Sequence, residues 1–247
     1  MKNYWFAILA LVVVLSSCQS QNLLQSSATN NQQVDSVFAY QRNYAYKIRK
    51  DDKVSISVWD HEELSVGSVY GIYNANEVYG RWLLVDANGN VTLPKTGDFH
   101  IQGLTVTQAE DSLKVVLEYW IPNPVIEIKV LNKEITAVGE LKSPGTFKMD
   151  KEEYTLLEVI GLAGDFDYYA NKKEVKIVRQ QDDQVHELVV DLTDMSNYRM
   201  TNIQIKPGDV VYVPSKKHKE FDKRAATTVV PFASVLTAAA IFFTAFF

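Results

Sequence analysis

Regular spacing of apolar and polar residues predicts alternating strands and helices over much of the chain. Residues 54–58 alternate between the two types, which indicates a half-buried strand. Asn88-Gly89 lies between alternating apolar residues and predicts a hairpin, because both residues tolerate positive φ. Thr105 and Gln108 form a capping box ahead of apolar residues at helical spacing. The segment VIEIKV then alternates as another strand.

A second series of elements follows. ITAVGEL leads into Ser143-Pro144-Gly145, for which we predict a type II turn with Gly145 at positive φ. Thr155 and Glu158 form another capping box, which opens a short apolar helix. EVKIVRQ and HELVVDL predict a hairpin around QQDDQ, and DVVYV predicts the last strand.

These elements divide into two α+β units, residues 46–130 and 131–214. Strands with an interposed helix favour a β-grasp arrangement, in which a sheet wraps around one helix. Two similar sequence segments lie near the start and the end of this region, and their alignment matches Asp52 with Asp209. Two such carboxylates could be catalytic, but an Asp at the start of a strand more often closes a turn.

The only cysteine lies at the end of an apolar run. Lys2 and the apolar residues 4–15 have the form of an export signal that is too short to span a bilayer. A free cysteine is most often a small buried residue, but polar residues follow Cys18. LSSC resembles a bacterial lipobox. We therefore predict a signal peptide over 1–17, acylation of Cys18, and a tether over 18–45.

The C-terminal residues 225–247 carry no charge and predict a membrane helix, preceded by a basic linker at 215–224. On a helical wheel small hydroxyl residues share one face and bulky phenylalanines the other, which favours packing between copies. The predicted packing face consists of Thr227, Ser234, Thr237 and Thr244. A basic cluster on the exported side conflicts with inner-membrane topology, so the pattern favours the outer membrane.

The composition of the chain argues against several classes of function. With 247 residues and a net charge of −5, the chain gives no basis for nucleic-acid binding. The four histidines lack the spacing of metal ligands, so we expect neither a metal site nor a cofactor. No catalytic residues are assigned. A glycan hydrolase using Asp60 with Glu62 or Glu63 is the enzyme alternative, although these residues more plausibly form a charged loop.

The aromatic insert 67–82 interrupts the first unit. Its aromatic side chains can stack on sugar rings or pack at a subunit interface, and we favour the interface. The residues concerned are Tyr70, Tyr73, Tyr79 and Trp82.

Taken in order, short phrases of both units resemble the bacterial polysaccharide biosynthesis/export family. In the first unit the phrases include Tyr46-Lys47-Ile48 with Asp52, Leu93-Pro94 with Gly97, and Asn123-Pro124-Val125. The second unit resembles a soluble-ligand-binding (SLBB) β-grasp domain. Its phrases include Val138-Gly139-Glu140, Pro144-Gly145-Thr146-Phe147, and Pro207-Gly208-Asp209. Long members of the family carry a second β-grasp domain, whereas this chain has one.

The resemblance implies an outer-membrane lipoprotein with its main domains in the periplasm. It implies a ring-shaped homo-oligomer, an octamer in known relatives, that passes capsular polysaccharide or exopolysaccharide outward without catalysis. The implied partners are membrane lipid, the polysaccharide itself, and an inner-membrane co-polymerase that often has tyrosine kinase activity. The alternative is a periplasmic sugar-binding adaptor that docks on a separate outer-membrane β-barrel exporter.

Overall fold

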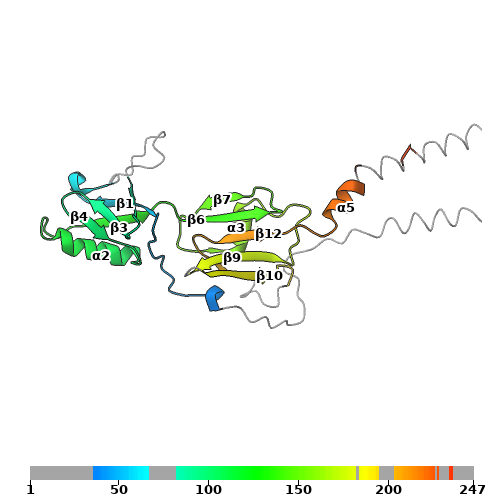
Figure 1. The fold of residues 1–247 in the computed structure, drawn as a ribbon, viewed down its shortest axis with the longest axis horizontal. Coiled ribbons are helices and arrows are strands. Elements are labelled where there is room, and N and C mark those ends of the chain that lie inside the picture. Colours follow the sequence, from blue (N-terminus) through cyan, green and yellow to red (C-terminus); the bar gives the residue numbers. More distant parts are fainter. Residues whose placement is uncertain are drawn as a thin grey trace, which may run out of the picture.

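The computed structural model describes residues 36–66, 82–181, 184–194, 203–225, 227, 234 and 235. They form two units that lie side by side, each with strands, a helix and its own buried core (Figure 1). The predicted α+β class and the order of the two units are confirmed. The N-terminal end of the described chain lies against the second unit, while the short helix α5 (Lys219–Arg224) lies at the end of that unit farthest from the first.

The first unit is built on a three-stranded antiparallel sheet. Its central strand β1 (Lys53–Val58) pairs with β2 (Leu83–Leu84) on one side and β5 (Ile126–Val130) on the other. The helix α2 (Val106–Leu117) is fastened to β5 by Glu110, whose Oε1 accepts a hydrogen bond of 2.9 Å from the backbone N of Ile128. Both predicted capping boxes, at Thr105 for α2 and at Thr155 in the second unit, are confirmed.

The segment around Asn88-Gly89 forms a turn rather than a simple hairpin. The Asp86 carboxylate accepts hydrogen bonds from the backbone N of Asn88 and of Asn90, at 2.8 and 2.7 Å, and Gly89 takes a φ of 79°. The strands that flank it have different partners: β2 pairs with β1, whereas β3 (Asn90–Leu93) pairs with β4 (Gly97–His100). The turn was predictable because it is local, but strand pairing is decided by contacts across the fold.

The second unit is a five-stranded mixed sheet with the order β10-β9-β12-β6-β7. Only β6 and β12 run parallel, and the other neighbours are antiparallel. The helix α3 buries Leu156, Val159 and Ile160 in a core shared with the sheet, as a β-grasp arrangement requires. The strands are β6 (Glu134–Gly139), β7 (Gly145–Lys148), β8 (Tyr154–Thr155), β9 (Val175–Gln181), β10 (Gln184–Val190), β11 (Gln204–Ile205) and β12 (Val210–Val213), and α3 spans Leu156–Leu162.

The predicted positive φ at Gly145 is wrong. Gly145 is the first residue of β7 and pairs with Ala137, so its backbone stays extended. Positive φ occurs instead at Gly139, at 100°, where β6 ends beside β12. A Cβ at Gly139 would lie 2.0 Å from the carbonyl oxygen of Val213, so the close approach of these two strands depends on glycine.

The C-terminal part of the described chain contains no helix that is both long and apolar enough to cross a membrane. Most of the predicted membrane helix 225–247 lies outside the described residues.

Replacing Gly139 by Ala should lower the free energy of unfolding by at least about 2 kcal/mol, because the new methyl group meets backbone and the φ is unfavourable. Gly145→Ala is the matched control, since a Cβ there has no atom within 4 Å. Urea denaturation of both variants measures the difference. Equal stability of the two would contradict the proposed close approach.

Candidate functional site at the junction of the two units

The two similar sequence segments, around Asp52 and Asp209, form equivalent turns. Asp52 Oδ2 accepts a hydrogen bond of 2.8 Å from the backbone N of Arg49, and Asp209 Oδ2 accepts one of 2.8 Å from the backbone N of Lys206. In both cases the carboxylate closes the turn over three residues, and both aspartates are buried. The preferred interpretation of these residues as turn-closing carboxylates is confirmed.

The two turns also meet each other across the junction. Arg49 Nη1 donates a hydrogen bond of 3.3 Å to the carbonyl oxygen of Pro207, and lies equally close to the position of a Cβ on Gly208. Lys53 N donates to Asn132 Oδ1 at 2.8 Å, at the connection between the units. The repeated sequence therefore places one turn of each unit at a common boundary.

Arg179, from β9, binds the second-unit turn that lies at this boundary. It is 5% exposed, and its Nε and Nη2 donate to the two oxygens of Asp209 at 2.9 and 2.7 Å. The remaining donors bind backbone carbonyls, Nη1 that of Val37 at 2.7 Å and Nη2 that of Gln204 at 2.9 Å. A buried ion pair is tolerated when its other hydrogen-bonding groups are also satisfied, and Arg179 makes four hydrogen bonds here.

Residues 36–46, which we call the N-terminal strap, run along the second unit before the chain enters the first. Phe38 is 2% exposed within the core of the second unit, and its ring centroid lies 4.9 Å from the guanidinium carbon of Arg179. Gln41 N donates to Gln204 Oε1 at 3.1 Å, and Gln41 Oε1 accepts from Lys206 Nζ at 2.9 Å. The end of the segment expected to be a tether is thus packed against the second unit.

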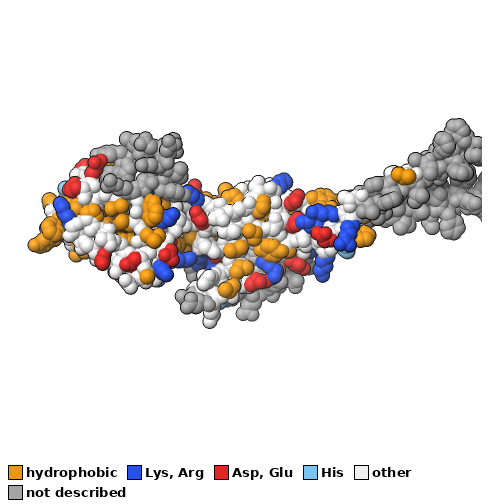
Figure 2. Space-filling model, turned by 45° about the horizontal axis from the view of Figure 1, so that its top comes forward, with side chains coloured by type: hydrophobic (Ala, Val, Ile, Leu, Met, Phe, Trp, Pro, Cys, Tyr) orange, Lys and Arg blue, Asp and Glu red, His pale blue; other side chains and the backbone are white. Residues whose placement is uncertain are grey.

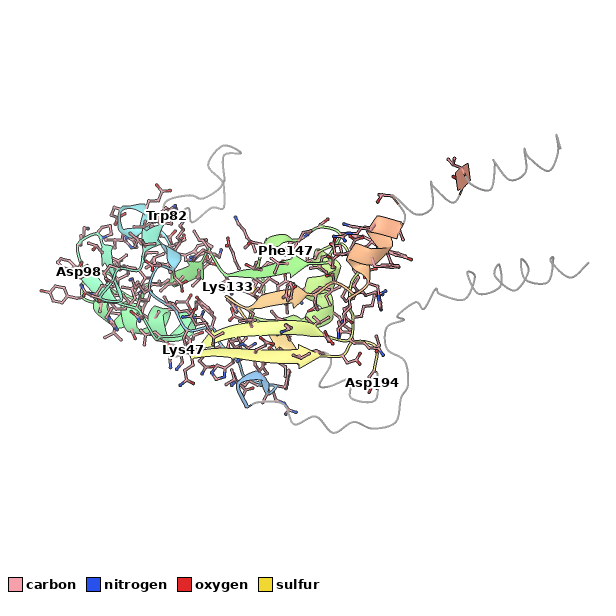
Figure 3. The ribbon with its side chains drawn as sticks, turned by 45° about the vertical axis from the view of Figure 1, so that its right-hand side comes forward. Lys47, Trp82, Asp98, Lys133, Phe147 and Asp194 are labelled. Carbon is pink, nitrogen blue, oxygen red and sulfur yellow. The ribbon has the colours of Figure 1, made fainter. Side chains whose placement is uncertain are left out.

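At its end the strap passes into the first unit through Tyr46. The Tyr46 hydroxyl donates to Asp52 with distances of 2.8 and 3.0 Å to the two carboxylate oxygens. The backbone N of Tyr46 donates to Glu152 Oε2 at 3.0 Å, and Glu152 Oε1 in turn binds Lys133 Nζ at 2.8 Å. Lys133 lies where the two units meet, as Figure 3 shows. One tyrosine therefore binds a residue of each unit.

Burial changes the ionisation of the tyrosines at this junction. It raises the pKa of Tyr44 to about 12, with Glu152 and Asp209 adding to the effect and Arg49 opposing it. Burial, followed by the charge of Asp52, also raises the pKa of Tyr46. Both phenols stay protonated at neutral pH, so Tyr46 remains a hydrogen-bond donor to Asp52.

Of the predicted aromatic contacts, only Trp82 lies within the described residues. Trp82 is 40% exposed, and Lys53 Nζ lies 4.6 Å from its ring centroid. Trp82 lies on the first unit (Figure 3). Tyr70, Tyr73, Tyr79 and the lipidation candidate Cys18 fall outside the described residues.

The predicted helix-packing face is described at two positions. Thr227 is exposed, and its hydroxyl donates to the carbonyl oxygen of Lys223 at 2.8 Å, one turn earlier. Such back-bonding satisfies the hydroxyl within its own segment. Ser234 is also exposed, whereas Thr237 and Thr244 lie outside the described residues.

The carboxylates of the enzyme alternative lie in a tight loop after β1. Ser65 Oγ closes this loop by accepting from the backbone N of Val58 at 2.8 Å. Hydrogen bonding by its own backbone, followed by His61, lowers the pKa of Glu63, whereas a general acid needs a raised pKa. Asp60 has a φ of 63°, and Glu62 begins the 3-10 turn η2 (Glu62–Leu64). The loop interpretation accounts for these residues.

In the described ranges, no group of three or more His, Cys, Asp or Glu side chains is arranged to hold a metal ion. The buried charges of the junction are engaged with one another and with backbone. This arrangement fixes the position of one unit relative to the other, and it is suited to a structural rather than a chemical role.

The sequence pattern did not lead us to predict structural roles for Arg179 and Phe38. Arg179 had a usable signal, because it follows Val175 and Ile177 at strand spacing and therefore occupies a core-facing position. A charge at such a position needs a buried partner. Phe38 had no comparable signal, since its partners are all distant in sequence.

Comparison with known proteins agrees with this division into units. Residues 40–131 match the family described as polysaccharide biosynthesis/export protein, and residues 133–213 match the SLBB domain. Similar relatives are two proteins named EPS I polysaccharide export outer membrane protein EpsA. The one from Ralstonia solanacearum is 31% identical over 130 residues, covering 48% of this chain and 34% of the relative. The one from Ralstonia nicotianae is 30% identical over 132 residues, with the same coverage of 48% and 34%.

The chain belongs to the polysaccharide biosynthesis/export family, with an export domain followed by an SLBB domain. The matched region spans about a third, 34%, of the length of these curated relatives.

Replacing Arg179 by Met should lower the free energy of unfolding by about 3–5 kcal/mol, because Asp209 would be left buried without its partner. Lys176→Met is the matched control on the same strand, since its ion pair with Glu187 is solvent-exposed and should contribute little. Denaturant unfolding of the two variants tests this difference. A small effect at Arg179, similar to that at Lys176, would contradict a central role for the buried pair.

Alkaline pH should destabilise the wild-type protein more than Tyr44→Phe. The pKa of Tyr44 is raised from 10.0 to about 12 on folding, so its stabilising effect is complete below pH 10 and is lost as pH rises toward 12. Between about pH 9 and pH 11 the wild type should lose up to about 1 kcal/mol more than the variant, allowing for solvent at this half-buried site. Urea midpoints at the two pH values measure this, and parallel curves would refute it.

Proposed function

We propose that this protein exports a polysaccharide, capsular or exopolysaccharide, from the periplasm through the outer membrane. The observation that carries the proposal is the ordered match of an export domain and an SLBB domain to two units that contact each other. The names of the two relatives support the same role. Transport rather than catalysis fits a chain whose buried charges fix the arrangement of its domains.

In this proposal the second unit faces the outer membrane. The strap is packed on the second unit, and Cys18 precedes Ser36 by 18 residues, which can span at most about 60 Å. An acyl anchor on Cys18 and a membrane helix over 225–247 would therefore both act on the second unit. The first unit would extend into the periplasm, toward an inner-membrane co-polymerase with tyrosine kinase activity.

We further propose that copies of the chain assemble into a ring, an octamer by analogy with the family, through which the polymer passes. A ring needs each subunit to present its surfaces at a constant angle. The contacts of Arg49 with Pro207 and of Tyr46 with Glu152 support such an angle, because they join the two units, and the Arg179–Asp209 pair holds the strap that leads to Tyr46. The insert 67–82 would contribute its aromatic side chains to contacts between copies.

A chain ended before Ala225 should fold normally but fail to restore surface polysaccharide in a strain that lacks the full-length protein, because it loses the membrane segment. The full-length chain with the surface change Lys114→Gln serves as the matched control. Polysaccharide shed into the medium and retained on the surface is quantified in each strain. Normal surface polysaccharide with the truncated chain would refute the proposed role of the C-terminal segment.

An epitope tag after Phe247 separates the exporter from the adaptor alternative. Antibody labelling of intact cells would place the C-terminus outside and support an exit pore. Labelling only after permeabilisation would favour a periplasmic adaptor that docks on a separate β-barrel exporter.

A further inference from the structure

A cationic surface lies at the end of the second unit that is farthest from the first. Residues 216–224 contain five Lys or Arg and two Asp or Glu, a net charge of +3 in a chain whose overall net charge is −5. Figure 2 shows Lys and Arg side chains gathered at this end of the second unit, over α5. Positive charge is thus concentrated here while the rest of the chain is acidic.

Exposed aromatic rings lie among these cations. Phe221 is 71% exposed, Tyr168 is 73% exposed, and Lys216 Nζ lies 5.9 Å from the ring centroid of Tyr168. We call Tyr168, Lys216, Lys217, Phe221, Lys223 and Arg224 the basic–aromatic surface. Aromatic rings next to Lys and Arg match the two layers of a membrane interface, where rings enter the acyl boundary and cations meet headgroups.

The surface is held firmly on the body of the second unit. The backbone N of Lys216 donates to the carbonyl oxygen of Tyr169 at 2.8 Å, and the backbone N of Asn171 donates to that of Pro214 at 2.8 Å. Lys219 is the inward-facing cation of α5 and forms an ion pair with Glu140. With Lys219 engaged, Lys217, Lys223 and Arg224 remain exposed beside Phe221.

We propose that the basic–aromatic surface binds the phosphate headgroups of an anionic lipid membrane. The inference rests on the proposed outer-membrane location and names the lipid chemistry that this end of the protein recognises. Charge complementarity favours it, and so does position, because the uncharged residues 225–247 follow immediately after Arg224. The surface would set how deeply the second unit sits against the membrane and stop it from tilting.

The test uses the full chain with Cys18→Ser and Phe221→Cys, labelled at the new thiol with an environment-sensitive fluorophore. Vesicles of phosphatidylcholine with and without phosphatidylglycerol are compared. We expect a blue shift of the label only with phosphatidylglycerol, and its loss at about 0.5 M salt, where the Debye length is about 4 Å.

A triple change, Lys217→Gln, Lys223→Gln and Arg224→Gln, should weaken the phosphatidylglycerol-dependent response about tenfold or more. Lys114→Gln on α2 should leave the response unchanged, and so serves as the matched control.

Each other result overturns the proposal in a distinct way. Equal shifts in both vesicles would mean that the apolar tail alone positions Phe221, and a chain that sediments with vesicles without any shift would mean that the surface stays in water. Both outcomes leave polysaccharide export untouched, since that is tested in cells. A shift produced by an acidic polysaccharide without vesicles would assign the surface to the polymer instead. Absence of any vesicle binding would also count against the membrane location in the proposed function.

Discussion

The guanidinium of Arg179 joins three parts of the chain that are distant in sequence. It forms two hydrogen bonds with Asp209, beside the final strand, and one each with the carbonyl oxygens of Val37 and Gln204. Arg179 and Asp209 are both almost fully buried. Removing either charge would leave the other buried without its ion-pair partner, so strap, hairpin and final turn depend on one another.

Tyr46 extends this dependence to the first unit, because the strap held by Arg179 ends at Tyr46, which binds Asp52 and Glu152. A buried ion pair contributes little net stability compared with apolar packing, but its geometry tolerates few alternatives. Here the geometry is shared with Phe38, whose ring is buried beneath the guanidinium, and with the paired turns closed by Asp52 and Asp209.

The two ends of the molecule differ in structure and in surface chemistry. The export unit lies at one end, and at the other lies the basic–aromatic surface with α5, docked through Lys219 and Glu140. The two ends of the described chain both leave from the second unit. Such a division suits the proposed function, in which one end meets a membrane and the other a periplasmic protein, because lipid and protein partners favour different surface chemistry.

Local features were predictable from sequence because their causes are local. Thr105 and Thr155 form their capping boxes within one turn of helix, and Asp52 and Asp209 close turns over three residues. The tertiary structure decided what depends on distant partners. It paired β2 with β1 rather than β3, placed the positive φ at Gly139 rather than Gly145, and buried Phe38 in the second unit. Such contacts join residues up to 165 positions apart, as between Gln41 and Lys206, and no local pattern specifies which of many compatible partners will meet.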